Sequence, residues 1–194
     1  MDKTLQSSDP DLNAAYSFFQ RLGVEDADHY FNTASIAWLE KSAVLQHQGK
    51  AQHYAYYLMS GILKACHYSE SGVERCKEFY FPNSLCLIFP SWIQNQDSRY
   101  QLESVTQVKC IKLPISLLSS QQWITAKVQL LEQQLLYKEQ KEAFFLLSSH
   151  EERYEYLVIN FPHWIQHLKS LDIANYMGIS PVSLSRIKKR INKC

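Results

Sequence analysis

Basic side chains gather at one end of this chain, where they could bind phosphates. Residues 169–194 contain six Lys or Arg and one Asp, a net charge of +5. Residues 1–168 contain 14 bases and 18 acids, a net charge of −4. The overall net charge of +1 is therefore the sum of a basic C-terminal segment and an acidic remainder. A local excess of cations attracts a polyanion such as nucleic acid.

The spacing within residues 170–191 predicts two short helices around a tight turn. Gly178 tolerates the positive φ of a sharp helix stop, and Ser180 before a proline is typical of a helix start. Leu184 and Ile187 face back toward the first helix. Hydroxyls and cations then face outward, as contacts to phosphates and a base edge require. The residues predicted to contact DNA are Ser180, Val182, Ser183, Ser185, Arg186, Lys188, Lys189 and Arg190.

The first of these two helices must support the second. We expect Leu171, Ile173, Ala174 and Met177 on its inner side, with Ile179 filling the corner. The alternative is a C-terminal helical hairpin whose basic face is only solvated.

Composition sets the class of protein. With 194 residues and 46% apolar content, the chain can form one large or two small packed domains. It has no apolar run of 18 residues and no signal-peptide pattern at its start, so we expect a cytoplasmic protein without a membrane partner.

The cysteines and histidines offer no strong metal or disulfide pattern. The five cysteines have no C-x-x-C spacing, and we expect the first four to be buried thiols and Cys194 to be incidental. His163 and His167 could share a helix face, but no third ligand is evident nearby, so no metal site is predicted.

The remaining elements follow from periodicity and turn residues. A helix is expected at residues 12–22, a second at 25–31, and short strands between 44 and 113. Runs at 54–59 and 62–68, joined by Ser-Gly, predict a tight hairpin. Short strands at this spacing suggest a compact β-barrel or jelly roll.

A long helix is predicted to run from Gln121 to about Leu147. Its apolar stripe, Ile124, Val128, Leu131 and Leu135, exceeds what a small barrel can cover, so we expect it to pair with a second copy. The alternative is that the stripe packs only on its own chain. A capping-box pattern starting at Ser149 predicts a further helix to Asn160.

Several motifs together resemble one known family. They are Glu151-Glu152-Arg153-Tyr154, Leu171-Asp172-Ile173-Ala174, Met177-Gly178-Ile179-Ser180, Leu184-Ser185-Arg186-Ile187, and Tyr57 to Lys64 with its turn glycine. Over roughly residues 12–191 the chain resembles the family of the cyclic-AMP receptor protein and the fumarate–nitrate regulator.

The resemblance implies a fold and a function. The fold would be α+β: a cyclic-nucleotide-binding-like β-roll (jelly roll) in residues 1–118, a dimerisation helix in 119–147 and a helix-turn-helix in 148–194. The implied function is bacterial transcription regulation by a homodimer on double-stranded DNA, with RNA polymerase as a candidate further partner.

The effector pocket departs from the family's cyclic-nucleotide sensors. Where those sensors have Gly-Glu, this chain has Cys86-Leu87, and where they have Arg-Ser it has Ser98-Arg99. A leucine accepts no hydrogen bond from ribose, which argues against a cyclic nucleotide as the cofactor. A one-residue shift in register would bring Arg99 into place, so that ligand stays an alternative.

Other known sensors also find little support. No cysteine precedes Cys66, so the iron–sulfur cluster of the fumarate–nitrate branch is not expected. Cys66 or His67 could serve as a haem ligand, but nothing in the sequence marks either one.

The DNA-reading positions also differ from those of the receptor. The Arg-Glu that follows the serine cap there is Pro181-Val182 here, while Arg186 matches the later base-reading arginine. We therefore expect a different target sequence, with Val182 against a thymine methyl and Arg186 on guanine.

Two further functions were weighed. One is a small-molecule sensor whose DNA binding is vestigial. The other is a cupin-like enzyme, which needs closely spaced metal ligands that His47, His53 and His67 do not provide. We therefore predict that the chain is not an enzyme.

Overall fold

The structure is a computed structural model that describes residues 10–24 and 35–191. The helix expected at 25–31 and Cys194 lie outside the described residues. Within the described part of the chain, no helix is long and apolar enough to cross a membrane.

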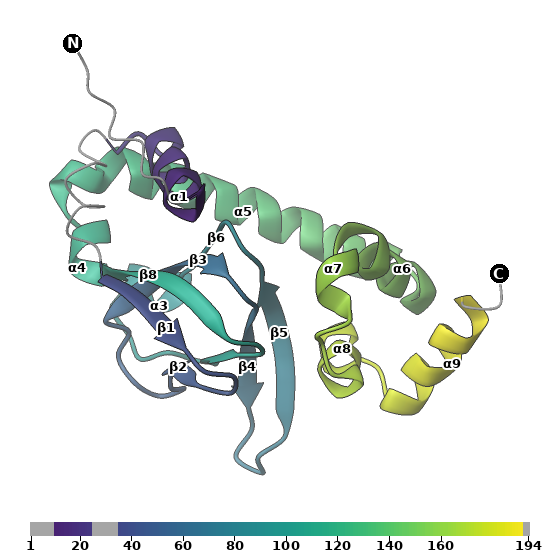
Figure 1. The fold of residues 1–194 in the computed structure, drawn as a ribbon. Coiled ribbons are helices and arrows are strands. Elements are labelled where there is room, and N and C mark those ends of the chain that lie inside the picture. Colours follow the sequence, from purple (N-terminus) through teal and green to yellow (C-terminus); the bar gives the residue numbers. More distant parts are fainter. Residues whose placement is uncertain (1–9, 25–34, 192–194) are drawn as a thin grey trace.

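Eight strands form two four-stranded antiparallel sheets, which we call the roll (Figure 1). The first sheet has the order β1-β8-β3-β6 and the second the order β2-β7-β4-β5. The strands are β1 Ser35–Leu39, β2 Val44–Gln46, β3 Tyr54–Ser60, β4 Leu63–Tyr68, β5 Glu74–Tyr80, β6 Ser84–Cys86, β7 Gln101–Ser104 and β8 Val108–Pro114.

The helices mostly follow the predicted order. They are α1 Pro10–Arg21, α3 Phe89–Gln94, α4 Ile115–Leu118, α5 Ile124–Leu147 preceded by a 3-10 turn at Gln121–Trp123, α6 His150–Asn160, α7 Pro162–Ile165, α8 Ser170–Met177 and α9 Pro181–Ile191. The apolar run at 85–89 is divided between β6 and α3, with Leu87 and Ile88 outside both elements. A proline in the first turn of α3 favours a helix start there.

Aromatic packing joins the outer face of the first sheet to the helices. Phe19 of α1 lies 5.5 Å from Tyr57 of β3 and 5.7 Å from Trp123, measured between ring centroids. All three side chains are buried, together with Ala126 and Leu130 of α5. Burial of this aromatic surface fixes the start of the long helix on the roll.

The predicted hairpin at residues 54–68 is wrong. Its two strands, β3 and β4, form in the expected places but lie in different sheets and do not pair with each other. The chain crosses between the sheets at Gly61, where a Cβ atom would lie 2.2 Å from the carbonyl oxygen of Gln107. Ser60-Gly61 therefore forms the connection between the two sheets, and this connection passes close to the turn between β7 and β8.

Replacing Gly61 by alanine should destabilise the roll severely. Gly61 has a φ of +88°, so the substitution combines left-handed strain with the clash against Gln107. We expect a loss of about 2–5 kcal/mol in the free energy of unfolding, measured by urea denaturation. Gly72→Ala is the control, because Gly72 has a similar φ of +77° and open space around it. Equal losses for both variants would contradict the steric argument.

The predicted capping box is confirmed at the start of α6. The Ser149 backbone N–H donates to the Glu152 carboxylate at 2.7 Å, and the Glu152 N–H donates to the Ser149 hydroxyl at 3.3 Å. This cap lets α6 begin directly after α5 with a sharp change of direction.

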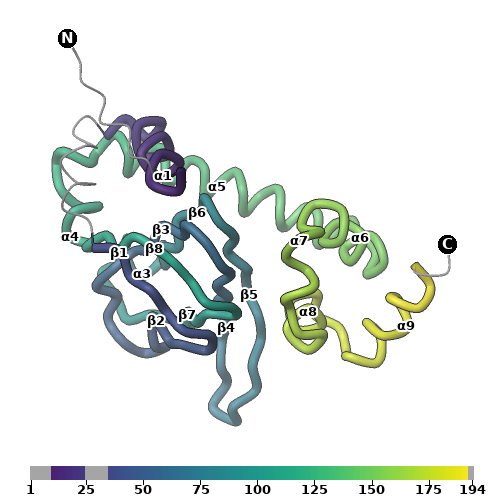
Figure 2. Tube along the Cα trace, viewed as in Figure 1, coloured from purple at the N-terminus to yellow at the C-terminus, as the bar shows by residue number. Residues whose placement is uncertain are grey.

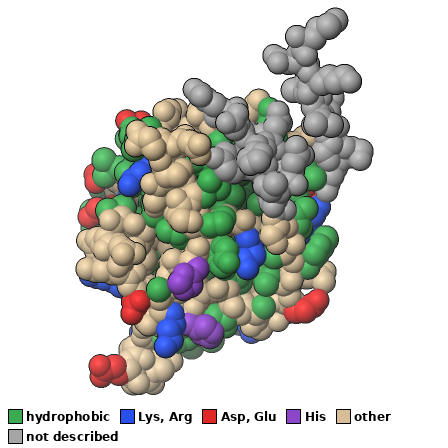
Figure 3. All heavy atoms as spheres, turned by 90° about the vertical axis from the view of Figure 1, so that its left-hand side faces the viewer, with side chains coloured by type: hydrophobic (Ala, Val, Ile, Leu, Met, Phe, Trp, Pro, Cys, Tyr) green, Lys and Arg blue, Asp and Glu red, His purple; other side chains and the backbone are tan. Residues whose placement is uncertain are grey.

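We call residues 150–191, from α6 to α9, the C-terminal module. Figure 2 shows α5 running from the roll to this module, which lies beside the second sheet with α8 nearest the strands and α9 farther out. The opposite end of the roll, seen in Figure 3, mixes apolar side chains with lysines and histidines. The basic helix is therefore on the side of the molecule away from that face.

Candidate nucleic-acid interface

The turn between α8 and α9 has the predicted geometry. Gly178 is left-handed, with a φ of +71°, and ends α8. Ile179 donates its N–H to the Ala174 carbonyl at 3.0 Å, which closes the turn. The Ser180 hydroxyl then caps α9 by accepting from the Ser183 N–H at 3.1 Å.

The inner face of α9 is held by its neighbours. Leu184 and Ile187 are buried, as predicted, in a cluster with Leu157 of α6 and with Ala174 and Met177 of α8. A helix anchored on one side in this way presents its other side in a fixed orientation.

One prediction for α8 is wrong. Leu171, expected on the inner side, is 55% exposed, whereas its neighbour Asp172 is only 4% exposed. The Asp172 carboxylate lies 2.9 Å from Nζ of Lys64 in β4, and this ion pair is what allows a charged side chain to face inward.

The predicted DNA-contacting residues all lie in or next to the first three turns of α9. Val182, Ser185, Arg186 and Lys189 are exposed, and Ser183 is half-buried. These residues form a hydroxyl-bearing, cationic surface, and Ser183, Arg186 and Arg190 also line a pocket shared with the start of α6.

Two of the cations already have partners within the chain. Lys188 Nζ lies 3.0 Å from the Ser170 hydroxyl, and Arg190 lies 2.7 Å from the Glu151 carboxylate. Both contacts are at the surface, where such pairs are weak, so phosphates could replace them. Arg186, Lys189 and Arg190 are exposed, whereas Lys188 is half-buried.

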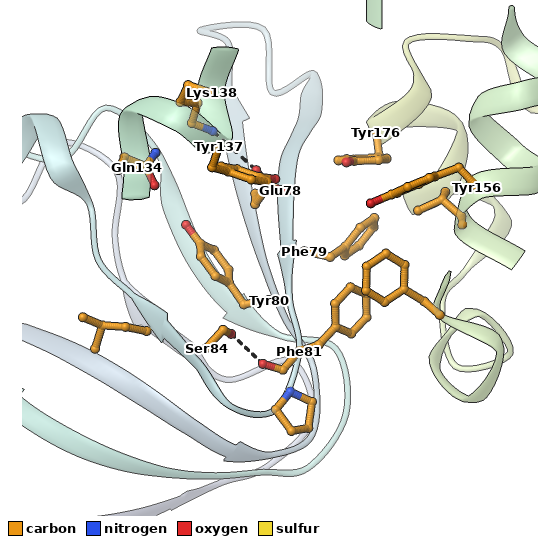
Figure 4. A pocket seen from close by; sticks show the side chains of 14 residues that line it. Glu78, Phe79, Tyr80, Phe81, Ser84, Gln134, Tyr137, Lys138, Tyr156 and Tyr176 are labelled. Atoms are coloured by element: carbon orange, nitrogen blue, oxygen red, sulfur yellow. Dashed lines mark hydrogen bonds and ion pairs between the residues drawn. The ribbon is translucent and has the colours of Figure 1, made fainter. Parts of the chain in front are cut away.

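A cavity of about 380 Å³ lies where the roll, α5 and the C-terminal module meet. Figure 4 shows Tyr80 and Phe81 from β5 and the loop after it, Tyr137 from α5, and Tyr156 and Tyr176 from the module around this space. Sequence patterns did not reveal it, because its aromatic side chains come from segments far apart in the chain.

One charged group lies at the rim of this cavity and is neutralised. The Glu78 carboxylate pairs with Lys141 at 2.8 Å and with Lys138 at 3.4 Å, as Figure 4 shows for the second pair. Burial raises the pKa of the Tyr137 and Tyr176 hydroxyls above their ordinary value. The Glu78 carboxylate, a hydrogen-bond acceptor for Tyr137, also raises the pKa of that hydroxyl, and both tyrosines are neutral at physiological pH.

The residues predicted for the effector pocket do not line this cavity. Cys86 and Leu87 are buried in packed apolar clusters. The Ser98 hydroxyl is committed to the Tyr100 backbone, donating to its carbonyl at 2.5 Å, while Arg99 is exposed. All four residues therefore lie in the roll, three of them buried, and their role as an effector pocket stays a prediction.

The remaining candidate ligands are also accounted for. The first four cysteines are free and buried, as expected. His67 is exposed, and its Nδ1 lies 2.9 Å from the Arg99 carbonyl oxygen. Among the described residues, no group of three or more His, Cys, Asp or Glu side chains could hold a metal ion.

The described residues thus form an antiparallel β-roll, a long connecting helix and a small helical module with a tight turn. No protein-family profile matches the chain. It is 27% identical over 174 residues to an anaerobic regulatory protein of Haemophilus influenzae, covering 80% of this chain and 66% of that protein. The chain thus spans just under two thirds of that relative's length.

Solved structures share the fold at low sequence identity. FixK2 from Bradyrhizobium japonicum superposes with a TM-score of 0.69 at 14% identity, covering 82% of this chain and 85% of that one. CLP, a c-di-GMP-responsive global regulator of Xanthomonas campestris, gives 0.62 at 13% identity, covering 88% and 91%. The resemblance to the family of the cyclic-AMP receptor protein and the fumarate–nitrate regulator is therefore confirmed. The relatives named as regulators also agree with the prediction that the chain is not an enzyme.

Proposed function

We propose that the chain is a dimeric DNA-binding transcription regulator whose α9 enters the major groove. The observation that carries this proposal is the structure of α9 itself. Its inner side is anchored by Leu184 and Ile187, while Val182 and Arg186 face solvent. In this proposal Arg186 contacts a guanine, Val182 contacts a thymine methyl, and the serines and lysines of α9 contact phosphates.

The proposed dimer forms through α5. Ile124, Val128 and Leu135 are 47%, 48% and 62% exposed in the isolated chain, and Leu146 is 76% exposed. At 100° per residue the first three lie along one side of α5 with the half-buried Leu131, opposite Ala126 and Leu130, which pack on the roll. Glu139 and Glu142 follow on the same side before Leu146, so the apolar stripe ends at Leu135. An apolar stripe of about three turns on a free surface favours burial against a second copy.

The proposed effector site is the aromatic cavity of Figure 4. Its walls suit a planar, mostly apolar ligand of small-molecule size, held by tyrosine hydroxyls. The walls belong to the roll, to α5 and to the C-terminal module. Such a ligand would therefore contact the proposed sensing domain, the proposed dimerisation helix and the proposed DNA-binding module at once. This cavity also favours the second candidate function, a sensor in which DNA binding is vestigial.

A regulator of this kind would act in the cytoplasm, where the chromosome and RNA polymerase are found. Its affinity for DNA would depend strongly on salt, because phosphate contacts supply much of the binding energy.

Selection of binding sites from genomic DNA with the purified protein, without ligand and at physiological salt, tests the proposal. We expect an inverted repeat with half-sites about one duplex turn apart, roughly 34–36 Å. If enrichment appears only after a cell extract is added, DNA binding depends on an effector. No enrichment under either condition would contradict the proposal and favour the sensor with vestigial DNA binding.

A further inference from the structure

A buried lysine links the roll to the C-terminal module. Lys64 of β4 is 7% exposed, and its Nζ lies 2.8 Å from Glu74, 2.9 Å from Glu103 and 2.9 Å from Asp172. The first two carboxylates belong to strands of the roll, and the third belongs to α8. One ammonium group therefore ties the module to the sheet that faces it.

The rest of the cluster is fully hydrogen-bonded. The Tyr68 hydroxyl lies 3.1 Å from the Glu74 carboxylate and 3.3 Å from that of Glu103. Burial would raise the pKa of Glu74, but the hydrogen bond and charge of Lys64 outweigh it and lower that pKa below its ordinary value. The Glu74 carboxylate thus remains ionised beside the lysine at neutral pH.

Apolar contacts also join the module to the roll, but they are less directional than the ion pair. Phe79 and Tyr176 lie 5.3 Å apart, and Phe81 stacks on Phe161 at 4.4 Å, measured between ring centroids. Burial of such surfaces holds two bodies together without selecting one orientation, whereas a charged hydrogen bond requires defined positions of both partners. Of the module–roll contacts, the Lys64–Asp172 pair is therefore the one best suited to set an angle.

The docked arrangement leaves the DNA-facing side of α9 free. The module contacts β5 mainly through α8, whereas Val182 and Arg186 on α9 remain exposed. Docking therefore does not block α9. Because α8 supports α9, the position of Asp172 determines how α9 is oriented relative to the long helix α5.

We propose that the Lys64–Asp172 ion pair fixes the separation of the two α9 helices in the dimer and so selects the spacing between DNA half-sites. This inference rests on the proposed function and assigns Asp172 and Lys64 as positioning residues that do not touch DNA. Without the pair, the module stays attached through α5 and the aromatic contacts, but its orientation varies. The dimer then accepts half-sites at several separations.

The test compares binding to inverted repeats that differ only in spacer length. Asp172→Asn keeps the side-chain shape and removes the charge, while Lys64 retains Glu74 and Glu103. Coupling between two sites is typically worth about 5- to 150-fold in affinity, and we expect the preference of the wild type for its best spacer to fall about tenfold. Affinity for a single half-site should not change, since α9 is untouched.

Glu103→Gln is the matched control, because it weakens the same lysine's pairing inside the roll and leaves the bridge to α8 in place. Glu103→Gln should keep the spacer preference of the wild type. A loss of that preference in Asp172→Asn alone could then not be due to general destabilisation of the cluster. Asp172→Glu, which retains the charge, should restore most of the preference.

An unchanged spacer preference in Asp172→Asn would overturn the inference and leave the proposed function intact. Failure of the wild type to bind any repeat would overturn both. Thermal unfolding of each variant, measured alongside, confirms that the compared proteins are folded at the assay temperature.

Discussion

Replacing Arg186 by alanine should abolish sequence-specific DNA binding while weakening non-specific binding only modestly. A bidentate arginine–guanine contact discriminates by about 1–3 kcal/mol, and a dimer makes it twice. The combined loss of about 2–6 kcal/mol corresponds to at least about a 30-fold lower affinity for the selected site. Arg186 is exposed on α9, so the substitution removes no packing that the fold needs.

Lys189→Ala is the control for Arg186→Ala. Lys189 is also an exposed cation of α9, but its proposed contact is to phosphate. Its loss should weaken binding about equally for all sequences and make binding less dependent on salt. Titration of both variants against the selected site and a scrambled site, at several salt concentrations, separates the two roles. Equal losses on both DNAs for Arg186→Ala would show that Arg186 does not contact a base.

The sequence predicted α9 well because its signals are local. Gly178, Ser180 and the pair Leu184 and Ile187 act within one or two turns, where capping and periodicity decide the structure. The same holds for the capping box at Ser149.

The sequence predicted pairing between distant segments poorly. The apolar runs of β3 and β4 revealed two strands, but periodicity does not say which strand lies beside which. The prediction that Leu171 faces inward is wrong for a related reason, since Asp172 is the buried residue at this point of α8. The partner that buries Asp172 is Lys64, 108 positions earlier in the chain.

Lys64 is the one residue of these two surprises that the sequence itself marks. It lies within the apolar run from Ile62 to Cys66, and a single charge in such a run implies a buried partner of opposite charge. The aromatic cavity had no comparable signal. Tyr80, Tyr137 and Tyr176 are each ordinary for their own element, and only the fold brings them together.

Leu135→Asp should convert the dimer to a monomer without unfolding the chain. Leu135 is 62% exposed in the isolated chain, so the substitution should change the free energy of unfolding of the monomer by no more than about 0.5 kcal/mol. In the proposed dimer the side chain is buried, and the two-fold axis would bring two carboxylates close together. Burial of a charge without a partner costs several kcal/mol, which exceeds what one leucine contact contributes.

Loss of the dimer should have a large effect on DNA binding. A monomer offers one α9 to an inverted repeat, so it loses the gain that comes from linking two sites, which is worth about 10²- to 10⁴-fold. Sedimentation equilibrium measures the oligomeric state, circular dichroism checks the fold, and a titration with the selected repeat measures affinity. Affinity for an isolated half-site should remain unchanged.

Val73→Asp provides the control for Leu135→Asp. Val73 is 43% exposed in the turn between β4 and β5, which Figure 1 places at the end of the roll away from α5. Its replacement should leave both dimerisation and DNA affinity as they are. A dimer that persists in Leu135→Asp would show that α5 does not form the interface. The proposal about half-site spacing would then fail as well, because the distance between the two α9 helices depends on a dimer axis along α5.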